Sequence, residues 1–210
     1  MKITLFGATG TIGQGILKEA LTRGHQVTAV LRDPSKLSAA DHLTVVKGDV
    51  FDPASVVAAA RGQDAVISAF GPGLEGEPQT LVRCAHALIE GTKKAGVRRL
   101  IVVNGAGSLE VAPGVQLIDT PQFPESWRPL GRAHRDALAV YRTADLDWTA
   151  ISPAAIIEPG QRSGHYRSGT EQLLVDEKGN SSITVEDFAI AVLDELEHPK
   201  NVRRRMTVAY

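Results

Sequence analysis

Apolar residues along the chain follow two spacings, one typical of buried strands and one typical of amphipathic helices. Apolar runs predict six strands, at residues 2–6, 25–31, 43–48, 64–70, 97–105 and 146–152. Apolar positions with helical spacing predict helices between them, at residues 12–24, 53–62, 77–95 and 127–144. Apolar strands separated by single helices are typical of a parallel sheet that is covered on both faces. The sequence therefore predicts an α/β fold with a doubly wound parallel sheet.

The last third of the chain departs from this alternation. Residues 153–170 are rich in glycine, serine and proline. Residues 172–184 are expected to form two short strands about the turn Lys178-Gly179-Asn180. Residues 185–199 have the spacing of an amphipathic helix, and residues 203–210 resemble an edge strand. Because no internal repeat or low-complexity linker separates this part, we expect one domain over residues 1–210 with a small C-terminal cap on the sheet.

The overall charge narrows the classes of partner. The chain has 43% hydrophobic and 22% charged residues and a formal net charge of -1, which favours neither nucleic acid nor an anionic membrane as a partner. The N-terminus lacks the pattern of a signal peptide, and no apolar run approaches the roughly 20 residues of a membrane-spanning helix. We expect a cytoplasmic monomer or homodimer that binds a small molecule and has no metal site.

The one cysteine, Cys84, excludes an intramolecular disulfide. It lies in LVRCAHALIE, within a predicted helix. A lone helical cysteine usually packs as a small apolar side chain. We therefore expect a buried residue rather than a reactive thiol.

Three glycines follow the first predicted strand at three-residue intervals, in the segment GATGTIG: Gly7, Gly10 and Gly13. The segment joins a strand to a helix, and the next strand follows within about 30 residues, as in a dinucleotide-binding Rossmann unit. Gly7 would allow a sharp turn, Gly10 would let backbone N–H groups approach a pyrophosphate, and Gly13 would bring helix and sheet close together. The helix N-terminus adds positive potential. The motif therefore predicts a nucleotide cradle rather than a merely structural turn.

The end of the second predicted strand bears on the choice of cofactor. An acidic residue there holds the ribose hydroxyls of NAD, whereas an arginine accommodates the 2′-phosphate of NADP. Here Arg32 ends the strand, followed by Asp33-Pro34 and Lys36. Asp33 has a ready role in a turn or N-cap but could still swing toward the ribose, and Lys36 could equally be a solvated surface charge. The pattern favours NADP(H) over NAD(H).

At this point several motifs carry a family resemblance. GATGTIG, the segment Gly48-Asp49-Val50 and SAFGPG at residues 68–73 resemble atypical short-chain dehydrogenase/reductases of the NmrA-like NAD(P)H-binding family. VVNGAGSLEVAPGVQLIDTP, LDWTAISPAAIIEPGQRSGHYR, LLVDEKGNSSITVEDFAIAVLDELEHP and RRRMTVAY are similar to bacterial NADH-flavin reductase-like proteins, and the family also includes biliverdin reductase B-like enzymes. The likeness covers nearly the whole chain. It implies a Rossmann fold and a hydride transfer from NAD(P)H.

The resemblance also implies roles for individual positions, all at the carboxyl ends of predicted strands. The implied cofactor-binding residues are Gly7, Thr9, Gly10, Thr11, Ile12, Gly13, Arg32, Lys36, Asp49, Val50, Ala69, Phe70, Gly71, Asn104, Ser152 and Pro153. Of these, Asp49 and Val50 would border the adenine, and Asn104, with Gly105 and Ser108, would face the nicotinamide. Phe70 and Ser152 could equally have packing and turn roles.

One departure from the wider superfamily bears on the reaction. Typical short-chain dehydrogenases carry Tyr-x-x-x-Lys, in which the tyrosine acts as a general acid. Here Tyr141 is followed four residues later by Asp145, and we expect Tyr141 to be a packing residue. Hydride transfer to a flavin leaves a delocalised anion that needs little help from an acid. The sequence therefore favours a flavin-like or other conjugated acceptor as substrate.

Three residues are candidates for a catalytic role: His134, Ser108 and His165. His134 occupies roughly the position at which relatives carry lysine, and histidine suits proton transfer near neutral pH. Either histidine could instead be an ordinary exposed residue. The site of proton donation stays open at this point.

Two long segments, 105–128 and 153–184, are expected to cover the substrate, since loops of this length are uncommon unless they cover a site or form an interface. Phe123, Trp127 and Tyr166 would line the acceptor pocket by stacking, although Phe123 and Trp127 could instead only anchor their loop. Two rival functions stay open. One is an NmrA-like redox sensor that binds NADP without turnover, and the other is a sugar-nucleotide epimerase or lyase, for which the short C-terminal region leaves little room.

Overall fold

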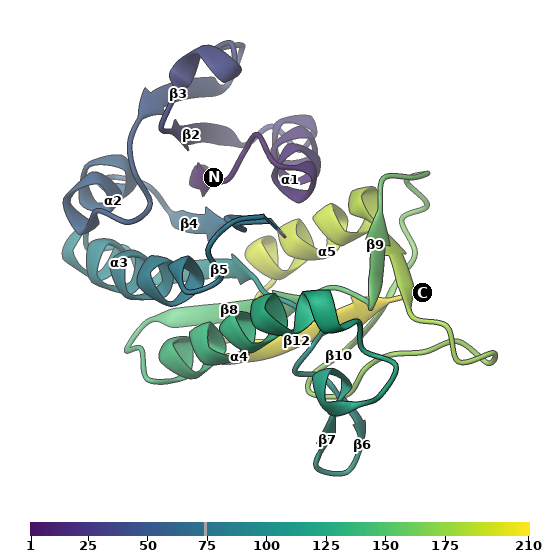
Figure 1. Cartoon of the computed structure of the whole chain (residues 1–210). Helices are drawn as coiled ribbons and strands as arrows, with labels where there is room; N and C mark the ends of the chain where they lie inside the picture. Colours follow the sequence, from purple (N-terminus) through teal and green to yellow (C-terminus); the bar gives the residue numbers. More distant parts are fainter. Residues whose placement is uncertain (74) are drawn as a thin grey trace.

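A computed structural model describes residues 1–73 and 75–210 of the chain (Figure 1). Within these residues, the central sheet has eight strands in the spatial order β10-β12-β8-β5-β4-β1-β2-β3. Their bounds are β1 (Lys2–Phe6), β2 (Gln26–Leu31), β3 (Leu43–Lys47), β4 (Ala65–Ser68), β5 (Arg99–Val103), β8 (Asp147–Ser152), β10 (Arg167–Gly169) and β12 (Arg204–Ala209). Neighbouring strands pair in parallel, except for antiparallel β10 and β12. The strand order reverses between β1 and β4, which creates the switch point where open α/β sheets bind ligands.

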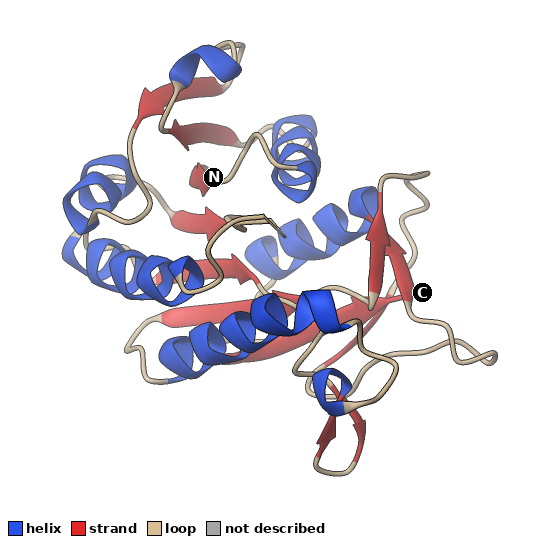
Figure 2. Ribbon diagram, viewed as in Figure 1, coloured by secondary structure: helices blue, strands red, loops and turns tan. Residues whose placement is uncertain are grey.

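Five α-helices within the described residues cover the two faces of this sheet (Figure 2). Their bounds are α1 (Thr11–Thr22), α2 (Pro53–Ala60), α3 (Thr80–Lys94), α4 (Arg128–Arg142) and α5 (Val185–Glu197). Helices α1 and α5 pack together on one face, and α2, α3 and α4 pack in sequence on the other. The predicted doubly wound Rossmann-like sheet is confirmed.

The alternation of side chains along the central strands explains why both faces are covered. In β1, Ile3 and Leu5 join the buried cluster beneath α1 and α5, while Phe6 joins the cluster beneath α2, α3 and α4. Both sets are nearly fully buried. Neither face of these strands therefore has a polar pattern that could face water.

Local signals fix two of the helix starts. Asp52 caps α2 by accepting a hydrogen bond from the backbone N–H of Ala54 at 2.9 Å, and Pro53 occupies the first turn. Thr184 caps α5 by accepting from the N–H of Asp187 at 3.2 Å. Aspartate at the N-cap and proline in the first turn are both residue types that favour the start of a helix.

The C-terminal cap differs from the prediction in two respects. The turn about Lys178-Gly179-Asn180 forms around Asp176, whose Oδ1 accepts from the N–H groups of Lys178 and Asn180, but no strand precedes it within residues 171–180. Strand β11 (Ser182–Thr184) instead pairs in parallel with β9 (Ile156–Glu158). Of the two short strands predicted about this turn, only the second forms, as β11, because the turn at Asp176 closes the loop without a strand ladder.

The final strand was also expected at the sheet edge, and this prediction is wrong. β12 lies between β8 and β10, and residues Arg167–Gly169 supply the edge. Its apolar run Met206 to Ala209 is therefore buried. Three residues of β10 are too few for periodicity to reveal.

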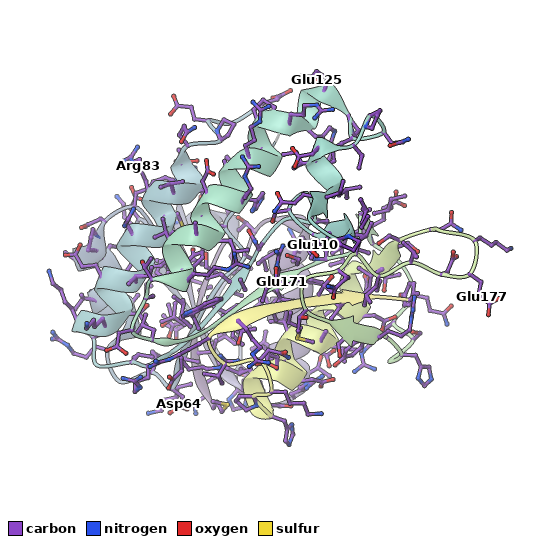
Figure 3. All side chains as sticks on the ribbon, turned by 90° about the horizontal axis from the view of Figure 1, so that it is seen from below. Asp64, Arg83, Glu110, Glu125, Glu171 and Glu177 are labelled. Atoms are coloured by element: carbon purple, nitrogen blue, oxygen red, sulfur yellow. The ribbon has the colours of Figure 1, made fainter. Side chains whose placement is uncertain are left out.

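The segment 105–128 contains short elements that the apolar pattern did not indicate. Strands β6 (Glu110–Ala112) and β7 (Val115–Gln116) form a small hairpin, followed by 3₁₀ turns at Leu117–Asp119 and Glu125–Trp127. Glu110 joins this hairpin to the C-terminal cap, because its N–H donates to the carbonyl of Glu171 and its carbonyl accepts from the N–H of Leu173, both at 2.8 Å. Figure 3 shows Glu110 and Glu171 on neighbouring segments. The two predicted covering segments therefore contact each other.

Among the helices described, none is long and apolar enough to cross a lipid bilayer.

Candidate functional site

The glycine loop between β1 and α1 is closed by backbone contacts that exclude side chains. Gly7 has φ 79°, and a Cβ atom there would lie 2.6 Å from the carbonyl carbon of Ala69. A Cβ atom on Gly13 would lie 1.9 Å from the carbonyl oxygen of Gly7. Gly7 thus turns the chain against β4, and Gly13 lets α1 start against the loop. These are the roles predicted for the first and third glycines.

Gly10 has a different environment, which leaves the start of α1 open. It is the N-cap of α1, no side chain caps the helix there, and the first turn carries no acidic residue. The nearest atom to a Cβ on Gly10 would be 3.5 Å away, in Gly7. The first N–H groups of a helix attract anions. The loop can therefore hold a phosphate group against α1.

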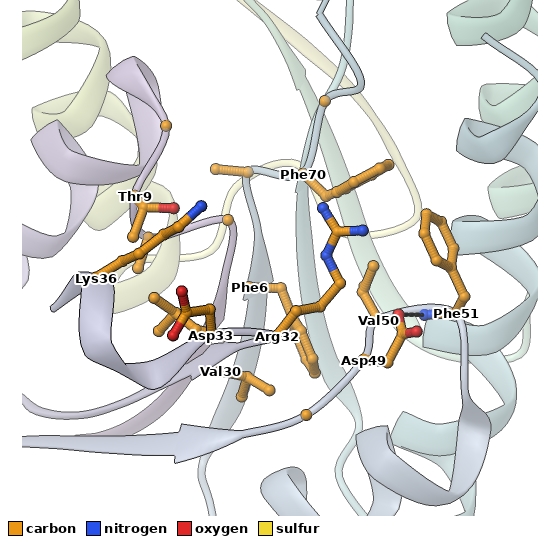
Figure 4. Close-up of a pocket in the computed structure, with 17 residues that line it drawn as sticks. Phe6, Thr9, Val30, Arg32, Asp33, Lys36, Asp49, Val50, Phe51 and Phe70 are labelled. Atoms are coloured by element: carbon orange, nitrogen blue, oxygen red, sulfur yellow. Dashed lines mark hydrogen bonds between the residues drawn. The ribbon is translucent and has the colours of Figure 1, made fainter. Parts of the chain in front are cut away.

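A cavity of about 290 Å³ begins at this loop and runs past the ends of β2, β3 and β4 (Figure 4). Ten of the predicted cofactor residues line it: Gly7, Thr9, Gly10, Arg32, Lys36, Asp49, Val50, Ala69, Phe70 and Gly71. Thr11, Ile12 and Gly13 continue the same loop into α1 but do not line the cavity, nor do Asn104, Ser152 and Pro153. The cavity therefore takes in the residues predicted for the phosphates and the adenine, together with Ala69, Phe70 and Gly71, which the resemblance places along the ribose and nicotinamide side.

Arg32, Asp33 and Lys36 meet at the rim of the cavity, and their hydrogen bonds differ. The Oδ1 atom of Asp33 accepts from the N–H of Ser35 at 3.1 Å and from its hydroxyl at 2.7 Å, which caps a 3₁₀ turn at Pro34–Lys36. These hydrogen bonds from Ser35 lower the pKa of Asp33. In the described part of the chain, no hydrogen bond or ion pair engages the side chain of Arg32 or Lys36. Two cations therefore stay available at the rim while the carboxylate is engaged.

The far end of the cavity carries an aromatic pair that sequence reasoning found only in part. Phe51 and Phe70 pack edge to face, with ring centroids 5.1 Å apart, and the Arg83 guanidinium lies 5.1 Å from the Phe51 ring centroid. Phe51 lines the cavity. Its place directly after Gly48-Asp49-Val50 could have pointed to it. Arg83 could not be found from the sequence, because it reaches Phe51 only through the packing of α3.

Asp49 holds the turn that presents this aromatic pair. Its N–H donates to the hydroxyl of Ser55 at 2.8 Å, and its Oδ1 accepts from the N–H of Phe51 at 3.0 Å. The carboxylate is thus committed partly to its own turn. Figure 4 shows Asp49 and Phe51 side by side with this bond.

A second cluster lies at the carboxyl ends of β5 and β8, where Asn104, Ser152 and His134 come together. Asn104 is 3% exposed, and its Oδ1 lies 3.1 Å from Nδ1 of His134 on α4. The hydroxyl of Ser152 donates to the carbonyl of Gly105 at 3.0 Å. Burial lowers the pKa of His134 to about 4. His134 is therefore a neutral imidazole near pH 7, which is a poor proton donor.

Ser108, a predicted catalytic residue, lies next to this cluster but is occupied by a structural contact. It is 2% exposed, and its Oγ accepts from Nη1 of Arg205 at 3.0 Å. Arg205 is equally buried and forms an ion pair with Glu171. Ser108 therefore anchors the segment 105–128 to β12 and the C-terminal cap.

Phe123 and Trp127, the two aromatic residues of segment 105–128 that were predicted to line the acceptor pocket, differ in their exposure to solvent. Phe123 is half-buried, and its ring tip packs where a Cβ on Gly107 or Gly131 would lie. Trp127, just before α4, is 47% exposed. Phe123 thus anchors the segment, which the sequence left open, and Trp127 has a face free for contact.

His165 and Tyr166 lie apart from both clusters. The hydroxyl of Tyr166 donates to Asp194 of α5 at 2.7 Å, and Tyr166 lines a separate cavity with His198 and Met206. His165 is exposed and follows Ser163, whose N–H and hydroxyl donate to Asp187. The structure therefore gives the hydroxyl of Tyr166 a contact with α5, and stacking of its ring on a substrate stays a prediction.

Cys84 and Tyr141 are both packed in the core beneath α3 and α4. Burial raises the pKa of the Cys84 thiol to about 12 and raises the pKa of Tyr141 well above its usual value. A thiol that stays protonated is inert as a nucleophile. The predictions of a buried cysteine and a packing tyrosine are confirmed.

Comparisons with known proteins agree with this geometry. The model of an NAD(P)H-binding family matches residues 7–199. The uncharacterised protein YwnB of Bacillus subtilis is 42% identical over 99% of this chain and 98% of its own length. A solved structure of a candidate exported protein from Burkholderia pseudomallei is 51% identical, covers 100% of both chains and has a TM-score of 0.93. A candidate NADH-flavin reductase from Streptococcus pneumoniae is 35% identical over 100% of this chain and 99% of its own, with a TM-score of 0.86.

Proposed function

The chain belongs to the NAD(P)H-binding family, and from this premise we propose that it is an NADPH-dependent oxidoreductase that reduces a flavin-like or other conjugated acceptor. The observation that carries the proposal is the cavity between the glycine loop and the strand ends, whose lining suits the phosphate and adenosine part of a dinucleotide. The likeness to a candidate NADH-flavin reductase supports the choice of acceptor.

The preference for NADPH rests on the charges at the cavity rim. A 2′-phosphate at the end of β2 would meet the guanidinium of Arg32 and the ammonium of Lys36, which suit a dianion. Asp33 also lines the cavity, and its lowered pKa keeps its carboxylate negative, so it offsets part of the attraction for a phosphate. Its Oδ1 accepts hydrogen bonds from Ser35, and Arg32 and Lys36 together outweigh this single negative charge. The rim therefore favours the phosphorylated cofactor.

The proposed class of acceptor rests on the proton donors that the chain has for the reaction. A ketone substrate needs a proton donor for the alkoxide that forms, and Tyr141 is buried away from any site. His134 has a lowered pKa, so its imidazole is neutral and a poor proton donor at neutral pH. A bound NADPH supplies a hydride, and a conjugated acceptor spreads the resulting charge without a protein acid. The chain would bind, align and shield the two reactants.

The test follows the absorbance of NADPH and of NADH after addition of riboflavin, FMN or a quinone to the purified protein. We expect oxidation of NADPH, dependent on acceptor, with a higher kcat/KM for NADPH than for NADH. NADPH binding without oxidation by any acceptor would instead support the rival function, a redox sensor that controls a partner. The observation that favours this rival is the lowered pKa of His134, because a neutral imidazole is a poor catalytic acid.

We also propose that the segments 105–128 and 153–184 cover the acceptor and that Trp127 stacks on it. Trp127 keeps an exposed ring at the start of α4, and the two segments are joined through Glu110 and Glu171. A Trp127→Ala variant should raise the KM for the acceptor and leave the Kd of NADPH unchanged. The proposed cytoplasmic location needs cell fractionation, because a close relative is described as exported.

A further inference from the structure

The side-chain amide of Asn104 is buried with one of its two ends unused. Its Oδ1 contacts Nδ1 of His134 at 3.1 Å. Its Nδ2 is buried and has no hydrogen-bond partner among the described residues. Leaving a buried N–H group unpaired costs free energy, so such groups in native proteins often serve a ligand or a catalytic step.

Three contacts, two from β8 and one from α4, fix Asn104 and the peptide that follows it. The backbone N–H of Asn104 donates to the carbonyl of Ile151 at 2.8 Å, which extends the pairing of β5 with β8 by one residue. The next peptide is fixed by Ser152, whose hydroxyl donates to the carbonyl of Gly105. A Cβ on Gly105 would lie 3.0 Å from Cγ and Cδ2 of His134, so the imidazole packs directly on the Gly105 backbone. The amide is thus preorganised before any ligand arrives.

The contact with His134 fixes which way the amide faces. With Oδ1 of Asn104 as the contacting atom, this hydrogen bond requires the tautomer of His134 that carries its proton on Nδ1, because an amide oxygen can only accept. The imidazole is neutral near pH 7 because burial lowers its pKa to about 4. The single N–H group of the neutral imidazole is therefore used to orient Asn104. The two N–H groups of Nδ2 are left on the opposite side of the planar amide.

We propose that Asn104 donates Nδ2–H to a carbonyl oxygen of the hydride acceptor, and that His134 is the positioning residue that orients the amide; this rests on the proposed oxidoreductase function. The hydride from a bound nicotinamide adds, with its electron pair, to an acceptor atom conjugated with that carbonyl. The acceptor is reduced, the nicotinamide is oxidised, and negative charge collects on the carbonyl oxygen, which water later protonates. Asn104 stabilises that charge, as an oxyanion-hole donor does.

The inference narrows the acceptor to conjugated carbonyl compounds, such as isoalloxazines, quinones and enones. Removing one oxyanion donor lowers kcat by about 10²- to 10³-fold. An acceptor without a carbonyl oxygen cannot use the amide. The two acceptor classes should therefore respond differently to the same substitution.

The first experiment measures Asn104→Leu in the full chain with NADPH and two acceptors. These are a naphthoquinone and a phenothiazinium dye without a carbonyl group, each corrected for its uncatalysed reaction. We expect kcat to fall about 100-fold or more with the quinone, and less than about threefold with the dye, while the Kd of NADPH changes less than about threefold. A parallel rise in the Kd of NADPH would assign Asn104 to the nicotinamide carboxamide and overturn the inference. Equal losses with both acceptors would overturn it as well.

The second experiment tests His134 with two variants. His134→Gln keeps an N–H donor for Asn104, and His134→Phe does not. With the quinone, we expect His134→Gln to retain at least about a third of kcat and His134→Phe to lose about tenfold, with kcat of the wild type flat between pH 5.5 and 8. An ionisation near pH 6 to 7 that disappears in His134→Gln would make His134 the proton donor and overturn its positioning role. His86→Gln, an exposed histidine on α3, is the control.

The third readout needs no turnover and no variant that folds poorly. In ¹⁵N-labelled protein saturated with NADP⁺, the side-chain amide protons of Asn104 should shift when the naphthoquinone is added, and they should not shift with the dye. Unchanged amide signals at saturating quinone would overturn the inference. If the wild type oxidises NADPH with neither acceptor, the proposed function itself fails, and this result is distinct from an active wild type in which Asn104→Leu has no effect.

Discussion

The two ends of the candidate site are built in different ways. The end near β1, β2 and β3 consists of short loops whose own residues shape them: Gly7 and Gly13 close on backbone atoms, and Ser35 holds Asp33 two residues away. The end near β5 and β8 joins Asn104, His134 and Ser152, which come from three separate elements. The phosphate end therefore depends on local chain geometry, and the other end depends on correct packing of α4 against the sheet. Substitutions should separate these two kinds of dependence.

The largest effect is expected from Gly13→Ala, because its Cβ would lie 1.9 Å from the carbonyl oxygen of Gly7. Backbone must move to relieve that contact, so the free energy of unfolding should fall by about 3 kcal/mol or more. Urea denaturation measures it. Gly10→Ala is the matched control, since its Cβ would have no neighbour closer than 3.5 Å. It should keep the stability and lose NADPH affinity, and equal stability losses in both variants would show that the loop is not locally determined.

The next largest effect is expected from His134, at the end of the site near β5 and β8, where its protonation should make the free energy of unfolding depend on pH. The pKa of His134 is about 4 in the folded chain and about 6.5 in the unfolded chain, so between these values the unfolded chain binds more protons. Stability should therefore fall as pH drops from about 6.5 to 4, by up to about 3 kcal/mol from this group. Urea denaturation at several pH values compares the wild type with His134→Gln, in which this contribution is absent. His86→Gln should keep the wild-type dependence, and an unchanged slope in His134→Gln would contradict the buried neutral imidazole.

A smaller effect is expected at the phosphate end from Arg32→Ala. Loss of a charged hydrogen bond to the 2′-phosphate should weaken NADPH binding by about 10- to 100-fold and leave NADH binding nearly unchanged. Fluorescence titration with each cofactor gives the two Kd values. Arg61→Ala, an exposed arginine beyond α2, serves as the control for net charge. Equal losses for the two cofactors would remove Arg32 from 2′-phosphate recognition.

The smallest effect is expected from Ser35→Ala, which removes the hydroxyl that donates to Asp33 at 2.7 Å. The backbone N–H of residue 35 still donates to Asp33 in this variant, but a carboxylate with one hydrogen bond fewer turns more easily toward ribose hydroxyls. The Kd of NADH should therefore fall by about two- to threefold while that of NADPH rises slightly. The same titrations measure both. Ser35→Thr keeps a hydroxyl and should behave as the wild type. If both cofactors bind to Ser35→Ala as they do to the wild type, Ser35 does not affect the preference for NADPH over NADH.

Much of the fold was predictable because its signals are local. The apolar runs located β1, β2, β3, β4, β5 and β8 within a few residues, and Asp52 with Pro53 marked the start of α2. The C-terminal part was predicted less well. β9, β10 and β11 have three residues each, and such short strands are defined by their partners rather than by their own periodicity.

The candidate site divides in the same way. The glycine spacing and Arg32 were readable because a turn, a helix start and a strand end follow one another within a few residues. The contacts of Arg83 with Phe51 and of Arg205 with Ser108 were not readable. Each joins residues that are distant along the chain, and no sequence period connects them.

The sequence by itself determined the order of strands and helices, the glycine turn before α1 and the cations at the end of β2. These follow from apolar spacing and from backbone sterics, which act over a few residues. Only the tertiary structure decided that His134 is neutral and contacts Asn104, and that Tyr166 contacts α5. Burial and hydrogen bonding set the charge and direction of these side chains, and both depend on which distant elements pack against them.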